Sequence, residues 1–585
     1  MLTTFILTAS IAAAADLPPI EAIAPQGTFL AISCKDMHGA WNAVRAGQLG
    51  KLYDDPKLKD LTGDESKELE KALDEAAKEL GIERKDMVLP GRMGVAVFGE
   101  RDEELDAMTM AFLVVTDFDA RADSGARMLQ AAFEKGAKEA DVTIEKAELQ
   151  GKEVWVIPMG KDEAEDVGAD DEFDGMGMDM GAFGAGPDTM YFMRDGEHMF
   201  IASSMAGLEE GLLASQGKGK GKGKMLADSD DWRGNAALLG SSDLSVTLLT
   251  GPLQDMLGPM MMGPMAMVQP AIASLFGDIR TWSLGLDVQP KDGILEMSGA
   301  AYIPGKKDGL VALLAKGQPI ANPPKLLGNE CVSYSCANVG FADLWKTIEA
   351  AVASLPEMQA EQLAPTLTAY EPIMTKALAV MGPSVHGVQW ADANAETGMG
   401  GVTAIACGDE KAGMPMLQMF APSVGLMPRD FQGATIFSGD LVPFAVGLGS
   451  GQMLMGESSG VEQALRAAGD KDTKGIADLP IYKRCVGVVA KGGVSAWGFT
   501  DTAAQLEAQK SAFDRLEGMQ DGMDGFVDDA GNPIDDIVTD EAMKNVKDIM
   551  GKFDAELMKK YLGPSVWWIT PGDKGFSMRG RLLMP

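Results

Sequence analysis

The chain has 585 residues, 46% of them hydrophobic, and a formal net charge of -35. This length exceeds what one hydrophobic core normally supports, and the apolar content is that of a folded protein. Because such an acidic chain repels phosphate backbones, the composition argues against nucleic acid as a partner.

The first residues have the pattern of a secretory signal. Residues 5–15 form an apolar run, and Ala13-Ala14-Ala15 fits a small-x-small cleavage site. We therefore expect residues 1–15 to be a signal peptide and the protein to be exported, periplasmic or extracellular. The segment before the apolar run carries no Lys or Arg, and the alternative is a buried N-terminal strand or helix.

Three blocks of sequence occur twice in the same order, which predicts an internal duplication. Each copy opens with a strand-like run ending in Ser-Cys, followed by a helix-like stretch that contains a tryptophan, Trp41 or Trp345. We expect these two tryptophans at equivalent, buried helix positions. The other two blocks pair residues 196–214 with 449–467, without gaps, and residues 282–304 with 563–585.

Within a copy, short gaps between strand-like runs favour antiparallel pairing, with helices covering the sheet. Residues 93–98 are expected to pair with 108–116, and 142–149 with 153–158. The predicted fold class is α+β: two copies of one unit, with antiparallel sheets and helices packed on one face. The predicted division is a first unit over 16–304, with an acidic flexible loop at 161–189, a linker over 305–324, and a second unit over 325–585.

The opening of the mature chain resembles a family of large exported bacterial proteins of unknown function. The resemblance rests on Ala24–Ser33, on Trp41 and on Leu49-Gly-Lys-Leu-Tyr-Asp-Asp-Pro56, with later strand–Ser–helix blocks. It implies an extracytoplasmic location, and it transfers no catalytic residue. The second copy lacks the Asp-Asp-Pro element.

One motif suggests a serine nucleophile. Gly456-Glu-Ser458-Ser-Gly460 matches the G-x-S-x-G elbow between a strand and a helix. A hydrolase of that kind needs a histidine after the serine, whereas His38, His198 and His386 all precede Ser458. We therefore interpret the motif as a helix cap, with Ser459 and Glu462 forming a capping box. His198 is expected to be a solvated turn residue.

Metal sites are suggested only by incomplete patterns. Residues 170–175 begin like a calcium loop, but Gly181 occupies the position of the bidentate Glu. Clustered methionines suggest copper, although Met is abundant throughout the chain, with 40 residues. The five cysteines lie in strand-like runs without a CxxC pair and are expected to be buried free thiols. No cofactor and no metal ligand are assigned.

The uncharged run from Met256 to Phe276 is the predicted contact segment. Its 21 residues would be long enough to cross a bilayer, but Pro259, Pro264 and Pro270 argue against a continuous helix. It is either packed inside the first unit or exposed as a Met-rich contact with a partner or a membrane surface. The contact residues assigned are Met256, Met260, Met261, Met262, Met265, Met267 and Phe276.

These observations favour a non-catalytic exported protein of the cell envelope or periplasm. We expect it to bind an unknown protein, glycan or envelope surface, with peripheral membrane contact through the Met-rich run. The alternatives are a serine or carboxylate hydrolase and a periplasmic protein that binds copper or calcium.

Overall fold

The structure is a computed structural model of the whole chain. It describes residues 17–102, 107–159, 188–218, 224–257, 270–271, 273–288, 294–314, 316–327, 331–392, 398–439, 444–470, 472, 474–520 and 555–585. For residues 59–70, 102, 107, 257 and 512–520 it describes the backbone alone.

The described residues fall into two compact units. The first comprises Met1–Ala43, Thr62–Met260 and Arg280–Asp287, and the second Val44–Leu61, Met261–Ile279 and Val288–Pro585. Strand β10 (Leu295–Tyr302) pairs with the C-terminal strand β20 (Gly575–Leu582) within the second unit. Helix α10 (Gly309–Leu314) lies in the segment expected to be a linker. The boundaries proposed from the sequence stay a prediction.

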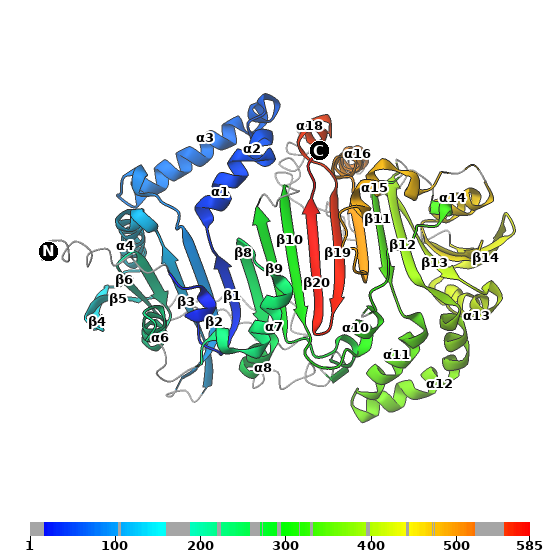
Figure 1. Cartoon of the computed structure of the whole chain (residues 1–585), viewed down its shortest axis with the longest axis horizontal. Coiled ribbons are helices and arrows are strands. Elements are labelled where there is room, and N and C mark those ends of the chain that lie inside the picture. The colour runs from blue at the N-terminus through cyan, green and yellow to red at the C-terminus, as the bar shows by residue number, and fades with distance from the viewer. Residues whose placement is uncertain are drawn as a thin grey trace, which may run out of the picture. The chain divides into compact units, whose positions relative to one another are not determined.

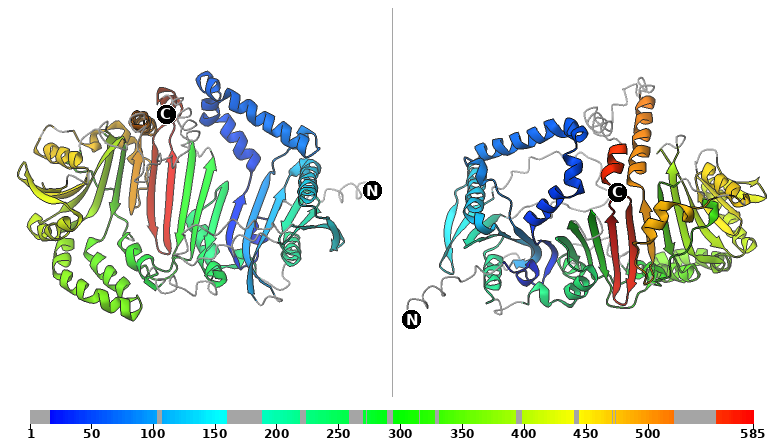
Figure 2. Two further views of the ribbon diagram at one scale, coloured as in Figure 1. Left: turned by 180° about the vertical axis from the view of Figure 1, so that it is seen from behind. Right: turned by 45° about the horizontal axis from the view of Figure 1, so that its top comes forward.

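The first unit is built on an antiparallel sheet whose strands lie side by side in the order β4-β5-β6-β7-β3-β2-β1-β8-β9 (Figures 1 and 2). The strands are β1 (Thr28–Cys34), β2 (Arg92–Asp102), β3 (Ala107–Asp117), β4 (Glu145–Leu149), β5 (Lys152–Pro158), β6 (Thr189–Asp195), β7 (His198–Ala202), β8 (Leu244–Leu249) and β9 (Thr281–Val288). The helices described before β9 are α1 (Met37–Ala46), α2 (Gln48–Tyr53), α3 (Pro56–Glu79), α4 (Ala122–Glu139), α6 (Met205–Ser215), α7 (Asp230–Leu239) and α8 (Thr250–Leu257).

The second unit has the strand order β14-β15-β16-β17-β13-β12-β11-β18-β19-β20-β10 (Figure 1). Its other strands are β11 (Ser333–Asn338), β12 (Met381–Ala391), β13 (Met399–Cys407), β14 (Met427–Phe431), β15 (Ala434–Ser438), β16 (Ala445–Gly449), β17 (Gln452–Gly456), β18 (Ala496–Thr500) and β19 (Ser565–Gly572). Its other helices are α11 (Leu344–Ala353), α12 (Glu357–Ala379), α13 (Glu410–Phe420), α14 (Ser458–Gly469), α15 (Pro480–Val486), α16 (Thr502–Gln520) and α18 (Ala555–Tyr561).

The two sheets have the same strand order when β1 to β9 are matched with β11 to β19, which confirms the predicted α+β fold in two copies. The expected pairs also form: β2 pairs with β3, and β4 with β5. The Pro-Gly-Asp-Lys turn joins β19 to β20 as a hairpin, with Gly572 paired to Gly575.

One face of each sheet is buried under a helix: α6, which follows β7, in the first unit, and α14, which follows β17, in the second. In the first unit, Leu208 and Leu212 of α6 pack on Phe98, Leu113 and neighbouring side chains. In the second, Val461 and Leu465 of α14 occupy the same place. We call this the inner face of each sheet. The opposite, outer face is covered by α4 at β5 to β7 and by α13 at β15 to β17. Helices therefore pack on both faces of each sheet, and not on one face as the sequence predicts.

The duplication is less regular than the sequence alignment predicts. Trp41 and Trp345 do follow equivalent strands, on α1 and α11, but Trp41 is 58% exposed and only Trp345 is buried. The block over 196–214 and 449–467 is not free of gaps. Asp195 matches Gly449 at the hairpin, whereas Gly207 matches Gly460 in the helix, so the connection between them differs by one residue.

The Asp-Asp-Pro element has a structural role. The Asp55 carboxylate accepts hydrogen bonds from the Lys57 backbone N–H at 3.0 Å, from Lys560 Nζ at 2.9 Å and from the Tyr561 hydroxyl at 2.7 Å. The bonds from Tyr561 and Lys560 lower the pKa of Asp55 to about 2, so the carboxylate stays ionised. It fixes the start of α3 and ties it to α18.

Candidate functional site

A trough opens on the outer face of the second sheet. Its volume is about 510 Å³, and none of the described side chains that line it carries a charge. Hydroxyl and amide groups come from β11, β12 and β13, and apolar groups from Phe444 and Met455. The lining residues are Ser333, Ser335, Gly387, Val388, Gln389, Gly401, Val402, Thr403, Phe444, Met455 and Gly456.

The trough exists because its floor has few side chains. A Cβ atom at Gly387 would lie 2.9 Å from the Ser335 Oγ, so a side chain there would displace the serine. A Cβ at Gly401 would lie 3.3 Å from the Val388 carbonyl oxygen. Since strand side chains alternate between faces, these positions point away from the core that supports them.

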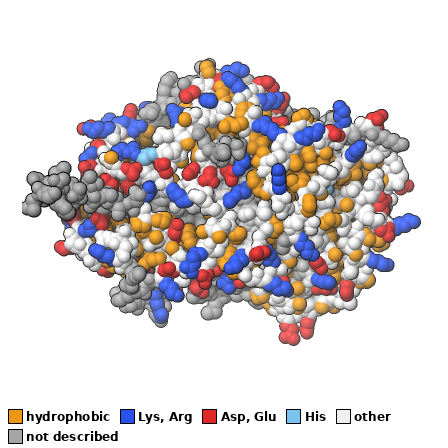
Figure 3. All heavy atoms as spheres, viewed as in Figure 1, with side chains coloured by type: hydrophobic (Ala, Val, Ile, Leu, Met, Phe, Trp, Pro, Cys, Tyr) orange, Lys and Arg blue, Asp and Glu red, His pale blue; other side chains and the backbone are white. Residues whose placement is uncertain are grey.

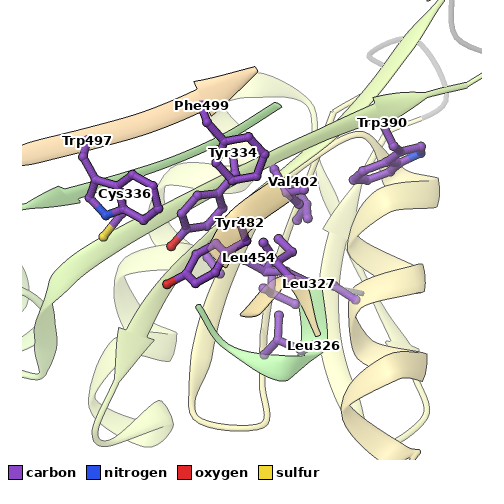
Figure 4. Packing of buried hydrophobic residues seen from close by; sticks show 14 of the residues in the cluster. Leu326, Leu327, Tyr334, Cys336, Trp390, Val402, Leu454, Tyr482, Trp497 and Phe499 are labelled. Carbon is purple, nitrogen blue, oxygen red and sulfur yellow. The ribbon is translucent and has the colours of Figure 1, made fainter. Parts of the chain in front are cut away.

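The floor is rigid because its neighbours along each strand are buried. Tyr334, between Ser333 and Ser335, packs with Trp497, Phe499 and Tyr482 on the inner face (Figure 4). The Tyr334 hydroxyl hydrogen-bonds to the His386 Nδ1 at 2.8 Å. Burial lowers the pKa of His386 to about 4, so this imidazole is neutral near pH 7. The trough is therefore backed by a packed, uncharged layer.

Strand registers identify the same positions in the first unit. Phe98 of the first unit and Trp390 of the second occupy equivalent positions. Each ring packs against a glycine of the covering helix: Phe98 against Gly207 of α6, and Trp390 against Gly460 of α14. We call a row of outer-face side chains at paired positions of neighbouring strands a rung. With Phe98 matched to Trp390, the strand pairings define two equivalent rungs in each unit. In the second unit the first rung is Gly401–Gln389–Ser333 and the second is Thr403–Gly387–Ser335.

Every one of these six positions is large and apolar in the first unit. The corresponding rungs are Phe112–Val97–Leu30 and Val114–Val95–Ile32. All six side chains are half-buried. The same fold therefore accepts branched and aromatic side chains on this face, and the serines, glycines, glutamine and threonine of the second unit are not imposed by the architecture. Compared with the first unit, these residues give the second unit less apolar volume and more hydroxyl groups on its outer face.

The outer face of the first unit remains apolar along β8 and β9. Val246, Trp282 and Leu284 are 37%, 50% and 56% exposed. Polar residues lie on the inner side instead, where the Ser283 hydroxyl hydrogen-bonds to Thr247 at 2.7 Å and accepts from the Asn235 amide. This distribution reverses the usual polarity of a half-buried sheet.

Among the sequence-assigned contact residues, two lie in the described structure. Met256 is buried at the end of α8, next to Gly99 of β2, and Phe276 is 47% exposed. Met260, Met261, Met262, Met265 and Met267 lie outside the described residues. The contact role of this segment stays a prediction. Of the acidic loop predicted over 161–189, residues 161–187 also lie outside the described residues, and Thr189 is the first residue of β6, which pairs with β5.

The serine motif is a helix start, but not with the predicted cap. Ser458 is the first residue of α14, the N-cap is Glu457, and no side chain caps the helix there. Glu462 instead receives hydrogen bonds from Arg429 and Arg466, both at 2.7 Å. The cap forms in the first unit, where Ser204 Oγ accepts from the Gly207 N–H at 3.0 Å. The capping box predicted for Ser459 is therefore wrong.

The three histidines contact different residues and do not form a cluster. His38 contacts Arg121 at 3.3 Å, and His386 contacts Tyr334. His198 is the first residue of β7 with a side chain only 16% exposed, 3.9 Å from Asp117, so the solvated turn expected for it is wrong. Among the residues that the structure describes, the hydrogen bonds of His38 and His386 go to Arg121 and Tyr334, and not to Ser458.

The cysteines are free thiols, as expected. Four are buried and Cys331 is half-buried. Cys485 lies on α15 and Cys331 lies just before β11, so the strand positions predicted for these two cysteines are wrong. By the strand registers, Cys34 of the first unit corresponds to Ala337 of the second, and not to Cys336. The shared Ser-Cys ending is therefore a coincidence, offset by one residue. Among the described residues, no group of three or more His, Cys, Asp or Glu side chains could hold a metal ion.

On the face shown in Figure 3, Lys and Arg side chains are interspersed with Asp and Glu, and hydrophobic side chains gather over the strands of the second unit. None of the helices within the described ranges is both long and apolar enough to cross a bilayer.

Comparisons with known proteins place the chain in no family. No protein-family model matches it, and no curated protein does. It is similar to two solved structures, crystal forms I and III of TP0453, at 11% and 10% sequence identity. Both alignments cover 44% of this chain, with 78% and 79% of the other chain and a TM-score of 0.23. A similarity this low supports no structural or functional argument.

Proposed function

We propose that this chain is a non-catalytic exported protein that binds an uncharged, hydroxyl-rich ligand in the trough of its second unit. The observation that carries the proposal is the replacement of six apolar outer-face residues of the first unit by Ser, Thr, Gln and Gly at the same positions of the second. A fold that accepts Leu30 and Ile32 has no structural need for Ser333 and Ser335.

The chemistry of the lining favours a neutral polar ligand. A charged ligand would leave its charge unpaired by the described lining residues, since none of these is ionisable. A purely apolar ligand would cover the hydroxyls of Ser333, Ser335 and Thr403 without satisfying them, at a cost of about 1–3 kcal/mol each. A ligand with its own hydroxyl groups meets both conditions, with Phe444 and Met455 as apolar walls.

Binding rather than catalysis is favoured by the same residues. Acid–base or nucleophilic catalysis requires a titratable group, or an activated serine with a base within hydrogen-bond reach. The nearest buried imidazole behind the trough floor is that of His386, which faces the inner side and is bonded to Tyr334. The signal-like residues 1–15 support export.

The test is a thermal-shift screen of neutral sugars and polyols against charged metabolites of similar size. We expect stabilisation by neutral polyhydroxylated compounds in the wild-type protein and its loss in Ser335→Ile, which places the first-unit residue in the trough. The matched control is Ile32→Val in the first unit, which should leave the shifts unchanged. Stabilisation by charged compounds alone, or equal shifts in Ser335→Ile, would contradict the proposal.

A further inference from the structure

Both rungs of the trough continue beyond it onto the next two strands. On the first rung, Ser333 pairs with Thr500 of β18, and Thr500 pairs with Ser565 of β19. On the second rung, Ser335 pairs with Gly498, and Gly498 pairs with Trp567. Thr500 and Ser565 are half-buried, so the row Gln389–Ser333–Thr500–Ser565 presents one polar side chain from each of four adjacent strands.

Trp567 forms one end of this surface. A Cβ atom at Gly498 would lie 2.9 Å from the Cε2 and Cζ2 atoms of the Trp567 ring. The indole therefore lies across β18 instead of standing away from the sheet, and glycine at 498 is what allows it. The ring is half-buried, which leaves part of it exposed beside Ser335 on the same rung.

The first unit again shows the contrast. Its rungs continue through Leu248 to Trp282 and through Val246 to Leu284, so ten of ten outer-face positions there are apolar. In the second unit, nine of the ten positions are Ser, Thr, Gln or Gly, the tenth is Trp567, and no charged residue occurs on either rung. The polar character thus extends over five strands and is not confined to the trough.

We infer that the ligand is a linear, uncharged oligosaccharide that lies across the strands, with successive sugar units over successive strands and one unit stacked on Trp567. This inference rests on the proposed function and adds the ligand's class and direction. Adjacent strands are about 4.8 Å apart, comparable with one sugar unit of an extended glycan. Each strand therefore offers one hydrogen-bonding side chain per sugar, and the indole offers an apolar face to the ring C–H groups.

Other polymers fit these rungs less well. An extended peptide adds to a sheet through the unpaired backbone of an edge strand, whereas β11, β12, β13, β18 and β19 each have strands paired on both sides. An anionic polymer requires Lys or Arg, and neither occurs on the two rungs. A lipid chain would suit the apolar rungs of the first unit rather than these.

The experiment is calorimetric titration of the full chain with neutral β-1,4-linked gluco-oligosaccharides, from the single sugar to the hexamer. We expect affinity to rise with length until the chain spans the polar row and then to level off. Trp567→Ala should weaken binding of the longer oligomers about tenfold and remove the fluorescence change on binding. Ser565→Ala, a milder change, should weaken the tetramer but not the dimer. Trp282→Ala in the first unit is the matched control and should change neither.

The outcomes separate the inference from the proposed function. If sugars bind and Ser335→Ile abolishes binding, but affinity is independent of length and of Trp567, the trough binds a small ligand and the inference is wrong. If no neutral saccharide binds the folded wild-type protein, both fail. Circular dichroism and unfolding curves establish that each variant is folded before its affinity is compared.

Discussion

Filling the trough with the side chains of the first unit is the most direct perturbation of the proposed site. The variant Ser333→Leu/Ser335→Ile/Thr403→Val places the residues found at Leu30, Ile32 and Val114 into the second sheet. Each change removes one hydroxyl and adds apolar volume on the outer face. Because the first unit packs the same residue types there, the fold should tolerate them.

The expected magnitudes follow from the geometry. Three hydroxyl hydrogen bonds to ligand are lost, each worth about 0.5–1.5 kcal/mol, so the affinity should fall roughly tenfold to thousandfold. The free energy of unfolding should change by no more than about 1 kcal/mol per site, because the positions are half-buried and β-branched or larger side chains suit strands.

The assay compares ligand affinity by calorimetry with stability by urea unfolding. The reverse variant in the first unit, Leu30→Ser/Ile32→Ser, is the control: it should lower the free energy of unfolding by about 1 kcal/mol per site through lost apolar burial while leaving affinity unchanged. Undiminished binding by the filled trough would refute the reasoning, since the hydroxyls would then play no part.

Three further outcomes test the packing that supports the site. Gly460→Ala should destabilise by about 1–3 kcal/mol in urea unfolding, since its Cβ would lie 2.8 Å from the Trp390 ring; an unchanged midpoint would mean that the ring moves freely. Ser204→Ala should cost about 1 kcal/mol of unfolding free energy through loss of the α6 cap, whereas Ser458→Ala should stay within about 0.5 kcal/mol, and equal losses would contradict the assignment of the cap. Burial lowers the pKa of His386 to about 4 from an ordinary value near 6.5. The contribution of the neutral imidazole to the free energy of unfolding is therefore fully present above pH 6.5 and is lost as the pH falls towards 4. Relative to His386→Gln, the wild type should lose up to about 3 kcal/mol over that window, and parallel pH curves would show that the imidazole is not buried neutral.

Local patterns in the sequence determined the elements and the duplication. The hairpin at Asp573-Lys574, the pairing of β2 with β3 and the free thiols follow from turn residues, alternation and the absence of CxxC, all of which act over a few residues. The interpretation of the Ser458 motif as a helix start instead of a nucleophile elbow rests on the chain order of the histidines, which can be read without the fold.

Features that depend on distant neighbours could not be predicted in the same way. The burial of Trp345 and the exposure of Trp41 differ on equivalent helices, because burial is set by what packs over a helix and not by its own periodicity. The cap at Ser204 and its absence at Ser458 depend on one residue of connection length. An alignment without gaps concealed that difference.

The candidate site was decided only by the tertiary structure. Alternation along residues 333–335 shows that Ser333 and Ser335 share a face, and a comparison with Leu30 and Ile32 could have flagged them. Sequence alone does not reveal that Gln389, Thr500 and Ser565 stand beside them. That row is created by strand order and register, and a shift of one residue would turn each hydroxyl to the opposite face of the sheet.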